Sequence, residues 1–258
     1  MKTIKIDLSE NLTSLEIVIF ADIHFGDPLC DIELVKEKVE YVKNNKNVYC
    51  IINGDILNNS TKNSVGDVYN EKETPMNQLA KMCILFEPIK DKILSITYGN
   101  HEYRTWKWDG VDLTRLMAMQ LGIEDRYAKE SALIFLRFGK MNSNKHYSKV
   151  PYVIFVTHGG GGGRKEGAKA IRLADMASIV DADIYIHSHT HLPMTMKQSF
   201  HRVDIRSSSV ALVTKLFVNT AATLNYGGYA EAAEFKPASK DNPHIILSGS
   251  TKQFKAIL

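Results

Sequence analysis

Three histidines fall within five positions of the segment IYIHSHTHLP, which spans residues 184–193. The whole chain has nine histidines, so this crowding needs an explanation. One interpretation is a strand end that is histidine-rich by chance. The other is a metal site, because neutral imidazole is the commonest metal ligand in proteins. The segment alone leaves both open, and candidate ligands elsewhere in the chain decide between them.

Four earlier apolar runs also end in polar residues that are able to bind a metal ion. These endings are Asp22–His24, Gly54–Asp55, Gly99–Glu102 and Thr157–Gly159. Ligands at the C-terminal ends of strands in an α/β sheet converge on one crevice, where such folds bind their ligands. Five such endings in order along the chain favour the metal interpretation of the histidine cluster.

The elements that must position these residues alternate between strand and helix. Apolar runs predict strands at 15–20, 48–52, 92–98, 132–138, 152–157 and 183–188, and helical spacing predicts helices at 31–45, 78–90, 112–121 and 168–180. Polar stretches predict a loop at 58–74 and a hairpin at 139–151, and strands follow at 194–203, 211–218 and 244–248. This alternation favours an α/β core with sheets between helical layers. No break marks a second domain, so we expect a single domain over residues 1–258.

Composition excludes some classes of protein and partner. Hydrophobic residues make up 44% of the 258 positions and charged residues 24%, which fits a globular protein with a substantial core. A net charge of +3 is too small to indicate a nucleic-acid binder by itself. Three cysteines without metal-ligand spacing suggest a reducing compartment. Because no long apolar segment or signal peptide is evident, we expect a cytoplasmic protein without a membrane partner.

The five endings together resemble the calcineurin-like metallophosphoesterase superfamily, whose signature runs DxH, GDxx, GNHE, H and GHxH. The resemblance spans residues 17–193, and it is to the small members without a capping domain that occur in bacteria and phages. It implies an α/β fold that is a four-layer α-β-β-α sandwich of two mixed sheets flanked by helices. Ser188 stands where the family usually has glycine, and we expect only a local adjustment there.

The resemblance also implies two divalent metal ions. The ligands of one would be Asp22, His24, Asp55 and His191, and the ligands of the other would be Asp55, Asn100, His158 and His189, with Asp55 bridging. Two divalent cations and two carboxylates leave a net charge of +2, which suits an anionic phosphoryl group. Mixed nitrogen and oxygen ligation suits manganese, iron, zinc or nickel better than magnesium, and we take manganese as the first choice among them.

Other residues are assigned from the resemblance and from their place beside the motifs. In the family the residue matching His101 is not a metal ligand and protonates the leaving oxygen or stabilises phosphoryl charge, so we predict His101 to be catalytic. Glu102 would make structural hydrogen bonds behind it, and His187 would serve packing or hydrogen bonding. We predict substrate contacts for Arg104 and Arg164.

Two segments that leave the site have two interpretations each. HEYRTWKWDG (101–110), taken as a loop, holds both tryptophans of the chain; its rings would either stack bases or anchor the loop to the core. GGGGGRKEG (159–167) is either a flexible connector or a phosphate-wrapping loop, and the second is slightly favoured because the loop leaves the site itself.

These observations predict a dinuclear-metal phosphoesterase that attacks its substrate directly with metal-bound hydroxide and forms no covalent intermediate. We favour a phosphodiester substrate, either DNA or RNA or a nucleotide-like diester. One alternative is a phosphomonoesterase, including Ser/Thr protein phosphatases; those usually carry GDxxDRG, whereas residues 54–60 read GDILNNS. The other is a non-catalytic scaffold of the same fold. Such members usually lose ligand histidines, whereas every ligand position is filled here.

Overall fold

Parallel strands of the first half of the chain form one of two six-stranded sheets. The structure is a computed structural model, and it describes residues 1–62, 64, 68–143 and 146–258. The first sheet has the order β12-β11-β2-β3-β4-β5. Its strands are β2 (Ser14–Phe20), β3 (Val48–Asn53), β4 (Ile93–Thr97), β5 (Tyr127–Ala128), β11 (His244–Ser248) and β12 (Phe254–Ile257). β2 to β5 run parallel, β11 pairs antiparallel with β2, and β12 pairs antiparallel with β11, so the sheet is mixed.

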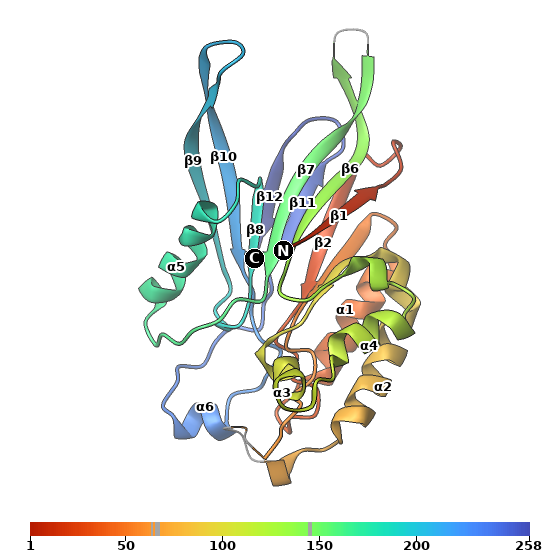
Figure 1. Cartoon of the computed structure of the whole chain (residues 1–258), viewed down its shortest axis with the longest axis vertical. Coiled ribbons are helices and arrows are strands. Elements are labelled where there is room, and N and C mark those ends of the chain that lie inside the picture. The colour runs from red at the N-terminus through yellow and green to blue at the C-terminus, as the bar shows by residue number, and fades with distance from the viewer. Residues whose placement is uncertain (63, 65–67, 144–145) are drawn as a thin grey trace.

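The second sheet is mixed as well and has the order β1-β6-β7-β8-β10-β9. Its strands are β1 (Lys2–Asp7), β6 (Ser131–Ser143), β7 (His146–Thr157), β8 (Ile184–His187), β9 (Met194–Asp204) and β10 (Ser209–Asn219). β7, β8 and β10 run parallel, while β6 pairs antiparallel with β7 and β9 with β10. The two hairpins, β6–β7 and β9–β10, extend to one end of the long axis (Figure 1).

Alternation along the strands divides the core between three interfaces. Successive side chains of a strand point to opposite faces. In β2, Val18 therefore packs under the helices whereas Ile17 and Ile19 pack between the two sheets. On the outer face of the second sheet, Tyr185 and Phe217 are stacked with ring centroids 4.7 Å apart.

Helices complete the outer layers, as Figure 1 shows. Those on the first sheet are α1 (Ile32–Asn44), α2 (Pro75–Phe86) and α4 (Leu113–Gln120), and they contribute Val39, Met82 and Met117 to its core cluster. On the second sheet, α5 (Glu166–Asp175) contributes Leu173. The layers therefore run helix, sheet, sheet, helix, which confirms the α-β-β-α sandwich. Among the described residues, no helix combines the length and the apolar character needed to cross a bilayer.

Several elements differ from the sequence-based prediction. The segment 101–110 is not a loop but most of helix α3 (Asn100–Asp109), because Glu102 accepts a hydrogen bond from the Gly99 backbone N–H (2.9 Å) and Gly110 ends the helix with φ 69°. The helix predicted at 168–180 divides into α5 and a 3-10 turn at Met176–Ser178. The prediction lacked β1, β5, β12 and the short helix α6 (Gly228–Ala232).

Shorter 3-10 turns lie at Val68–Asn70, Glu87–Lys92 and Glu124–Arg126. Positions 63 and 65–67 of the loop predicted at 58–74, and positions 144–145 of the predicted hairpin, lie outside the described residues.

Candidate metal centre

Five of the seven residues predicted as metal ligands adopt a left-handed backbone conformation. Asp22, His24, Asp55, His189 and His191 have φ between 50° and 65°. Such a conformation is uncommon for residues other than glycine and costs on the order of 1–3 kcal/mol each. All five lie in turns, two to four positions beyond the last residue of β2, β3 or β8.

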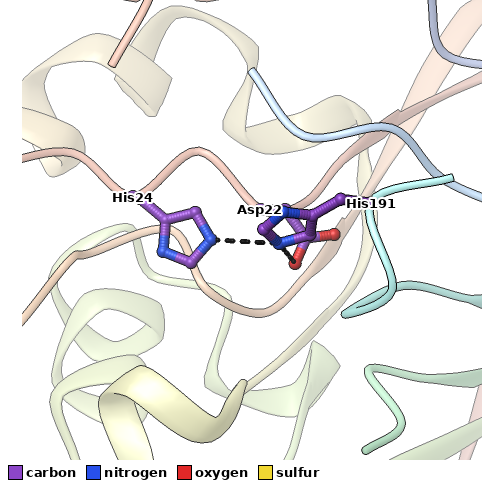
Figure 2. Close-up of side chains that lie close together, drawn as sticks. All are labelled: Asp22, His24 and His191. Carbon is purple, nitrogen blue, oxygen red and sulfur yellow. Dashed lines mark hydrogen bonds and ion pairs between the residues drawn. The ribbon is translucent and has the colours of Figure 1, made fainter. Parts of the chain in front are cut away.

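The first group of side chains joins the ends of β2 and β8. Single ligand atoms of Asp22, His24 and His191 all lie within 4.8 Å of one another. Nε2 of His191 is 3.3 Å from Nε2 of His24 and 3.3 Å from Oδ1 of Asp22. Figure 2 shows the dashed lines that join the His191 ring to the other two side chains.

The second group lies around Asp55, at the end of β3. Asp55, His158 and His189 offer ligand atoms within 4.8 Å of one another, and Oδ2 of Asp55 is 3.3 Å from Nε2 of His158. Oδ1 of Asn100 lies 3.2 Å from the same nitrogen. Since Oδ2 of Asp55 is also 3.9 Å from Nε2 of His24, Asp55 lies between the two groups.

Burial makes the charges of this cluster strongly interdependent. Burial alone would raise the pKa of Asp55, but the charges of His158 and His101 hold it well below its ordinary value. Burial alone would lower the pKa of His158, but the charge of Asp55 and its hydrogen bond raise it to about 10. Burial and the charge of His101 lower the pKa of His24 well below its usual range. Positive charge beside the buried carboxylates is therefore stabilising here.

The donor set fits divalent cations. Oδ2 of Asp22 accepts hydrogen bonds from the His189 backbone N–H (3.1 Å) and the Thr220 hydroxyl (3.3 Å). Its other oxygen, Oδ1, is buried and makes no hydrogen bond among the described residues, and its close contact at 3.3 Å is the ion-pair distance to Nε2 of His191. A buried carboxylate oxygen of this kind is costly unless a cation or donor meets it. Imidazole nitrogen with carboxylate and amide oxygen suits manganese, iron, zinc or nickel.

His101 lies at the inner end of α3, beside Asp55. Its Nδ1 is 2.6 Å from the carbonyl oxygen of Asn58. Because a carbonyl only accepts, Nδ1 carries a hydrogen, and the opposite nitrogen, Nε2, lies 3.8 Å from Oδ2 of Asp55. Burial lowers the pKa of His101, and the nearby Arg104 lowers it further. His101, His24 and Asp55 also form a third set of atoms within 4.8 Å, which the sequence did not predict.

Glu102 makes the structural hydrogen bonds that the sequence predicted for it. Its buried carboxyl accepts from the backbone N–H groups of Asp55 (3.0 Å), Leu57 (2.9 Å) and Gly99 (2.9 Å). Burial and the charge of Asp55 raise its pKa to about 7. His187 is also a hydrogen-bonding residue: its Nδ1 is 2.8 Å from Oδ1 of Asn219.

The segments after β3 and β4 approach each other so closely that Gly54 and Gly99 have no room for a side chain. A Cβ on Gly99 would overlap the carboxylate of Asp55, and a Cβ on Gly54 would lie 2.5 Å from the backbone nitrogen of Gly99. Gly54 also has φ 77°. Ser188, where the family has glycine, is buried and accepts a hydrogen bond from Nδ2 of Asn53 (2.7 Å).

Two cationic side chains bind backbone carbonyls close in sequence or space to the predicted ligands. Arg104 on α3 donates to the carbonyl of Asn58 (3.1 Å), the same oxygen that His101 approaches. Lys169 on α5 donates to the carbonyl of Thr190 (2.7 Å), between the two histidines of that turn that are predicted as ligands. Arg164 instead lies over the ring of Phe235, with 5.2 Å from its guanidinium carbon to the ring centre, and its part in substrate binding stays a prediction.

Sequence reasoning missed Lys169 and three residues that hold the site in place. Asn53, at the end of β3, bonds to three other segments of the site. Asn219, at the end of β10, donates to the Thr190 hydroxyl (2.8 Å) and the Leu192 carbonyl (2.6 Å). Thr220 contacts Asp22 as described above. A usable signal existed for Asn219 and Thr220, because they are polar residues that end the apolar run 211–218, as in the other five motifs. Lys169 lies inside a helix and carried no such signal.

Comparison with protein families gives one assignment. The model of the calcineurin-like phosphoesterase family matches residues 15–193, a span that includes all the residues predicted to bind metal. A comparison with curated protein sequences finds no match.

Among solved structures the likeness is remote. A predicted phosphoesterase from Streptococcus pneumoniae is 14% identical, with a TM-score of 0.40 over 95% of this chain and 90% of its own. A nuclease, MPE, from Pseudomonas putida is 12% identical, with a TM-score of 0.37 over 93% of this chain and 87% of its own. A double mutant of Vps29 from Entamoeba histolytica is 11% identical, with a TM-score of 0.38 over 95% of this chain and 98% of its own.

Proposed function

This chain belongs to the calcineurin-like phosphoesterase family, and from that premise we propose that it is a metal-dependent phosphoesterase with a preference for phosphodiesters. The observation that carries the proposal is the pair of side-chain triads, Asp22–His24–His191 and Asp55–His158–His189, each with ligand atoms within 4.8 Å of one another. Their members come from strands of both sheets, and five of the seven proposed ligands are in a left-handed conformation. Strain of this kind clusters at functional sites.

The proposed ligands are Asp22, His24, Asp55 and His191 for one cation and Asp55, Asn100, His158 and His189 for the other. When bound, the cations would supply Lewis acidity that lowers the pKa of water and neutralises phosphoryl charge. The two carboxylates leave such a pair with excess positive charge, which favours an anionic substrate. We place manganese first among the candidate metals.

His101 is the proposed catalytic side chain of this site. The Asn58 carbonyl holds its Nδ1 at 2.6 Å, which fixes the ring so that Nε2 faces the centre beside Asp55. A proton held at Nε2 is in position for transfer to the leaving oxygen, and imidazole suits this because its pKa lies near neutrality. Burial keeps the pKa of His101 below its usual value on balance, and the charge of Asp55 opposes that effect.

Arg104 and Lys169 are proposed to hold the substrate's non-reacting oxygens from the two sides of the centre. Both ammonium and guanidinium groups retain unused donors here, since each is described with one backbone carbonyl as its hydrogen-bond partner. We propose a third contact from Arg164. The preference for diesters rests on the aromatic and cationic side chains of α3, which begins at Asn100 and His101.

An assay panel tests this proposal. The protein would be supplied with Mn²⁺ or with a chelator and offered bis-p-nitrophenyl phosphate, p-nitrophenyl phosphate, single- and double-stranded DNA, and cyclic nucleotides. We expect metal-dependent hydrolysis that is faster on the diester than on the monoester. Faster monoester hydrolysis would overturn the diester preference in favour of a phosphatase. Inactivity on every substrate, with metal bound, would support the scaffold alternative and end the enzyme assignment.

A further inference from the structure

The outer face of α3 exposes a row of aromatic side chains. Tyr103 and Trp106 are three residues apart and therefore project from the same face of the helix. They are 41% and 37% exposed, and Trp108 near the helix end is 58% exposed. Neither tryptophan belongs to the core clusters of the described residues, which counts against the interpretation that these rings anchor the segment to the core. Large aromatic side chains left in solvent beside a polar site are typical of a binding surface.

A neighbouring side chain packs against each of these rings. Tyr103 is stacked on Tyr98, with ring centroids 5.7 Å apart and planes 20° from parallel. The ammonium of Lys129 lies 3.9 Å from the centre of the Trp106 ring, and that of Lys107 lies 4.8 Å from the Trp108 ring. Ordering the rings in advance reduces the entropy cost of stacking a further flat group on them.

A hollow of about 520 Å³ adjoins Trp106. Arg115 and Glu124 in its wall form an ion pair of 2.7 Å, and Tyr127 donates to Asp112. The wall as a whole has three basic side chains and three acidic ones, so the hollow is close to neutral. Attraction for a ligand there would come from ring stacking more than from net charge.

The position of α3 relates this surface to the metal centre. The helix begins at Asn100 and His101, and an α-helix rises about 1.5 Å per residue, so Tyr103 and Trp106 follow at roughly 4.5 Å and 9 Å along its axis. Consider a ligand that carries flat rings at regular spacing between its phosphates. With one phosphate at the proposed metal centre, its neighbouring rings would lie along the outer face of α3. Bases of a single strand expose their faces for such stacking, whereas those of a duplex do not.

We propose that the outer face of α3, with Tyr103, Trp106 and the adjoining hollow, is a stacking platform for the bases of a single-stranded polynucleotide. The inference deepens the proposed function, because it names the substrate class that the phosphodiester site would receive. Stacking on aromatic side chains tolerates any base, so the platform binds without sequence preference. Arg104 and Lys107 supply a small number of phosphate contacts, and we expect a correspondingly weak dependence of affinity on salt.

Tryptophan fluorescence tests the platform directly, because both tryptophans of the chain lie on α3. The protein in chelator, where no cleavage occurs, would be titrated with oligothymidylate, with oligouridylate, with a duplex and with inorganic polyphosphate. We expect saturable quenching by the two single strands, and little by the duplex or by polyphosphate, which has phosphates but no bases. Equal quenching by duplex, or equal competition by polyphosphate, would overturn the stacking platform.

Variants measured by anisotropy of a labelled single strand assign the effect to one ring. Trp106→Ala is expected to weaken binding on the order of tenfold, since a base stacked on an aromatic contributes about 1–3 kcal/mol. Trp106→Phe keeps a flat ring and is expected to restore most of the affinity, which separates stacking from a folding defect. Failure of Trp106→Phe to restore affinity, with normal circular dichroism in both variants, would overturn the proposal.

The matched control is Tyr147→Ala. Tyr147 is 70% exposed, and Lys140 lies over its ring at 4.0 Å, but it belongs to the β6–β7 hairpin at the other end of the long axis from α3 (Figure 1). We expect unchanged binding in this variant. The two proposals fail separately. Hydrolysis of the small diester without quenching by single strands would overturn only the stacking platform. Quenching without hydrolysis would overturn only the enzyme assignment.

Discussion

Several residues proposed as metal ligands lie at strained backbone positions. The left-handed conformations of Asp22, His24 and Asp55 cost free energy that an ordinary extended backbone would avoid. The three are held in place by main-chain bonds between the segments after β2 and β3, such as Asp22 N–H to Gly54 O (3.1 Å) and His24 N–H to Asp55 O (2.9 Å). The folded chain therefore orders these side chains before any cation arrives.

The role of His101 is the first prediction at this scale. His101→Ala removes the group that would hold a proton for the leaving oxygen, but it leaves the proposed ligands in place. We expect metal content to stay at the wild-type value while turnover of the diester falls on the order of 10²-fold or more. Elemental analysis and steady-state rates on one preparation provide the measurement. A parallel loss of metal would show that His101 is a ligand of the third triad.

A second residue-scale prediction concerns stability and pH. Burial lowers the pKa of Lys38 on α1 from 10.5 to about 8, against the opposing charges of Asp241 and Asp31. Its buried ammonium finds no hydrogen-bond partner among the described residues. Between about pH 8 and 10.5 the folded chain has released this proton and the unfolded chain has kept it, so folding stability rises with pH over that window.

Lys38→Met should therefore raise the free energy of unfolding near pH 7, on the order of 1–3 kcal/mol, and remove this contribution to the rise above pH 8. Denaturant unfolding at pH 7 and pH 10 measures both effects as differences from the wild type. Lys36→Met is the control, because Lys36 is exposed on the same helix. If the wild type and Lys38→Met kept a constant difference across this range, the buried ammonium would have no energetic role.

At the scale of elements, one side chain connects four strand ends. The Asn53 amide, at the end of β3, donates to the Thr157 carbonyl after β7 (2.9 Å) and to the Ser188 hydroxyl after β8 (2.7 Å). Its Oδ1 accepts from Thr97 at the end of β4 (2.8 Å), and its own carbonyl lies 2.8 Å from Nδ1 of His158. The strands so joined are those that present the second proposed metal site.

Asn53→Ala is expected to loosen this junction. Three buried polar groups lose their partners, so the free energy of unfolding should fall by about 1–3 kcal/mol or more. Metal affinity should fall about tenfold, as is common when groups behind metal ligands are removed. Calorimetry and metal titration measure the two effects, with Asn44→Ala at the exposed end of α1 as control. Unchanged metal affinity would show that the junction does not orient the ligands.

The predictability of an element from sequence depended on what stabilises it. Strands such as β2 and β3 are apolar on both faces because helices cover one and the second sheet the other, and this produced runs that sequence alone identified. Helix α3 was missed because its polar and aromatic residues have no buried stripe, and its ends are set by Glu102 and Gly110. β1 was missed because KTIKID reads as half-polar and pairs only with β6 at the sheet edge.

The candidate site also has residues that were predictable from sequence and residues that were not. Candidate ligands were predictable because they follow strands in a fixed order, and the family model covers that order. Asn53 and Lys169 act through contacts with residues far away in the chain, Ser188 for the first and Thr190 for the second. Only the folded arrangement brings such pairs together, so no local pattern could have indicated them.

At the scale of the whole molecule, the proposed metals would cross-link the two sheets. Asp22, His24, Asp55 and Asn100 follow strands of the first sheet, whereas His158, His189 and His191 follow strands of the second. Without cations, the buried carboxylates depend on protonated His158 for compensation, consistent with its pKa of about 10. Cation binding to the folded state alone should therefore stabilise the entire sandwich.

Metal removal tests this coupling. Ligand present at a hundredfold excess over its dissociation constant adds about 2.7 kcal/mol, which for a chain of this size corresponds to a rise in Tm of roughly 5–10 °C. Calorimetry in Mn²⁺ and in chelator gives the shift.

Asp55→Asn replaces the proposed bridging carboxylate with a neutral amide, so it should weaken or lose both metals and most of the shift together. Asp181→Asn, at an exposed carboxylate paired with Arg202 and Lys215, should keep the shift. Wild-type metal content in Asp55→Asn, or identical Tm values with and without Mn²⁺, would contradict a centre that Asp55 bridges.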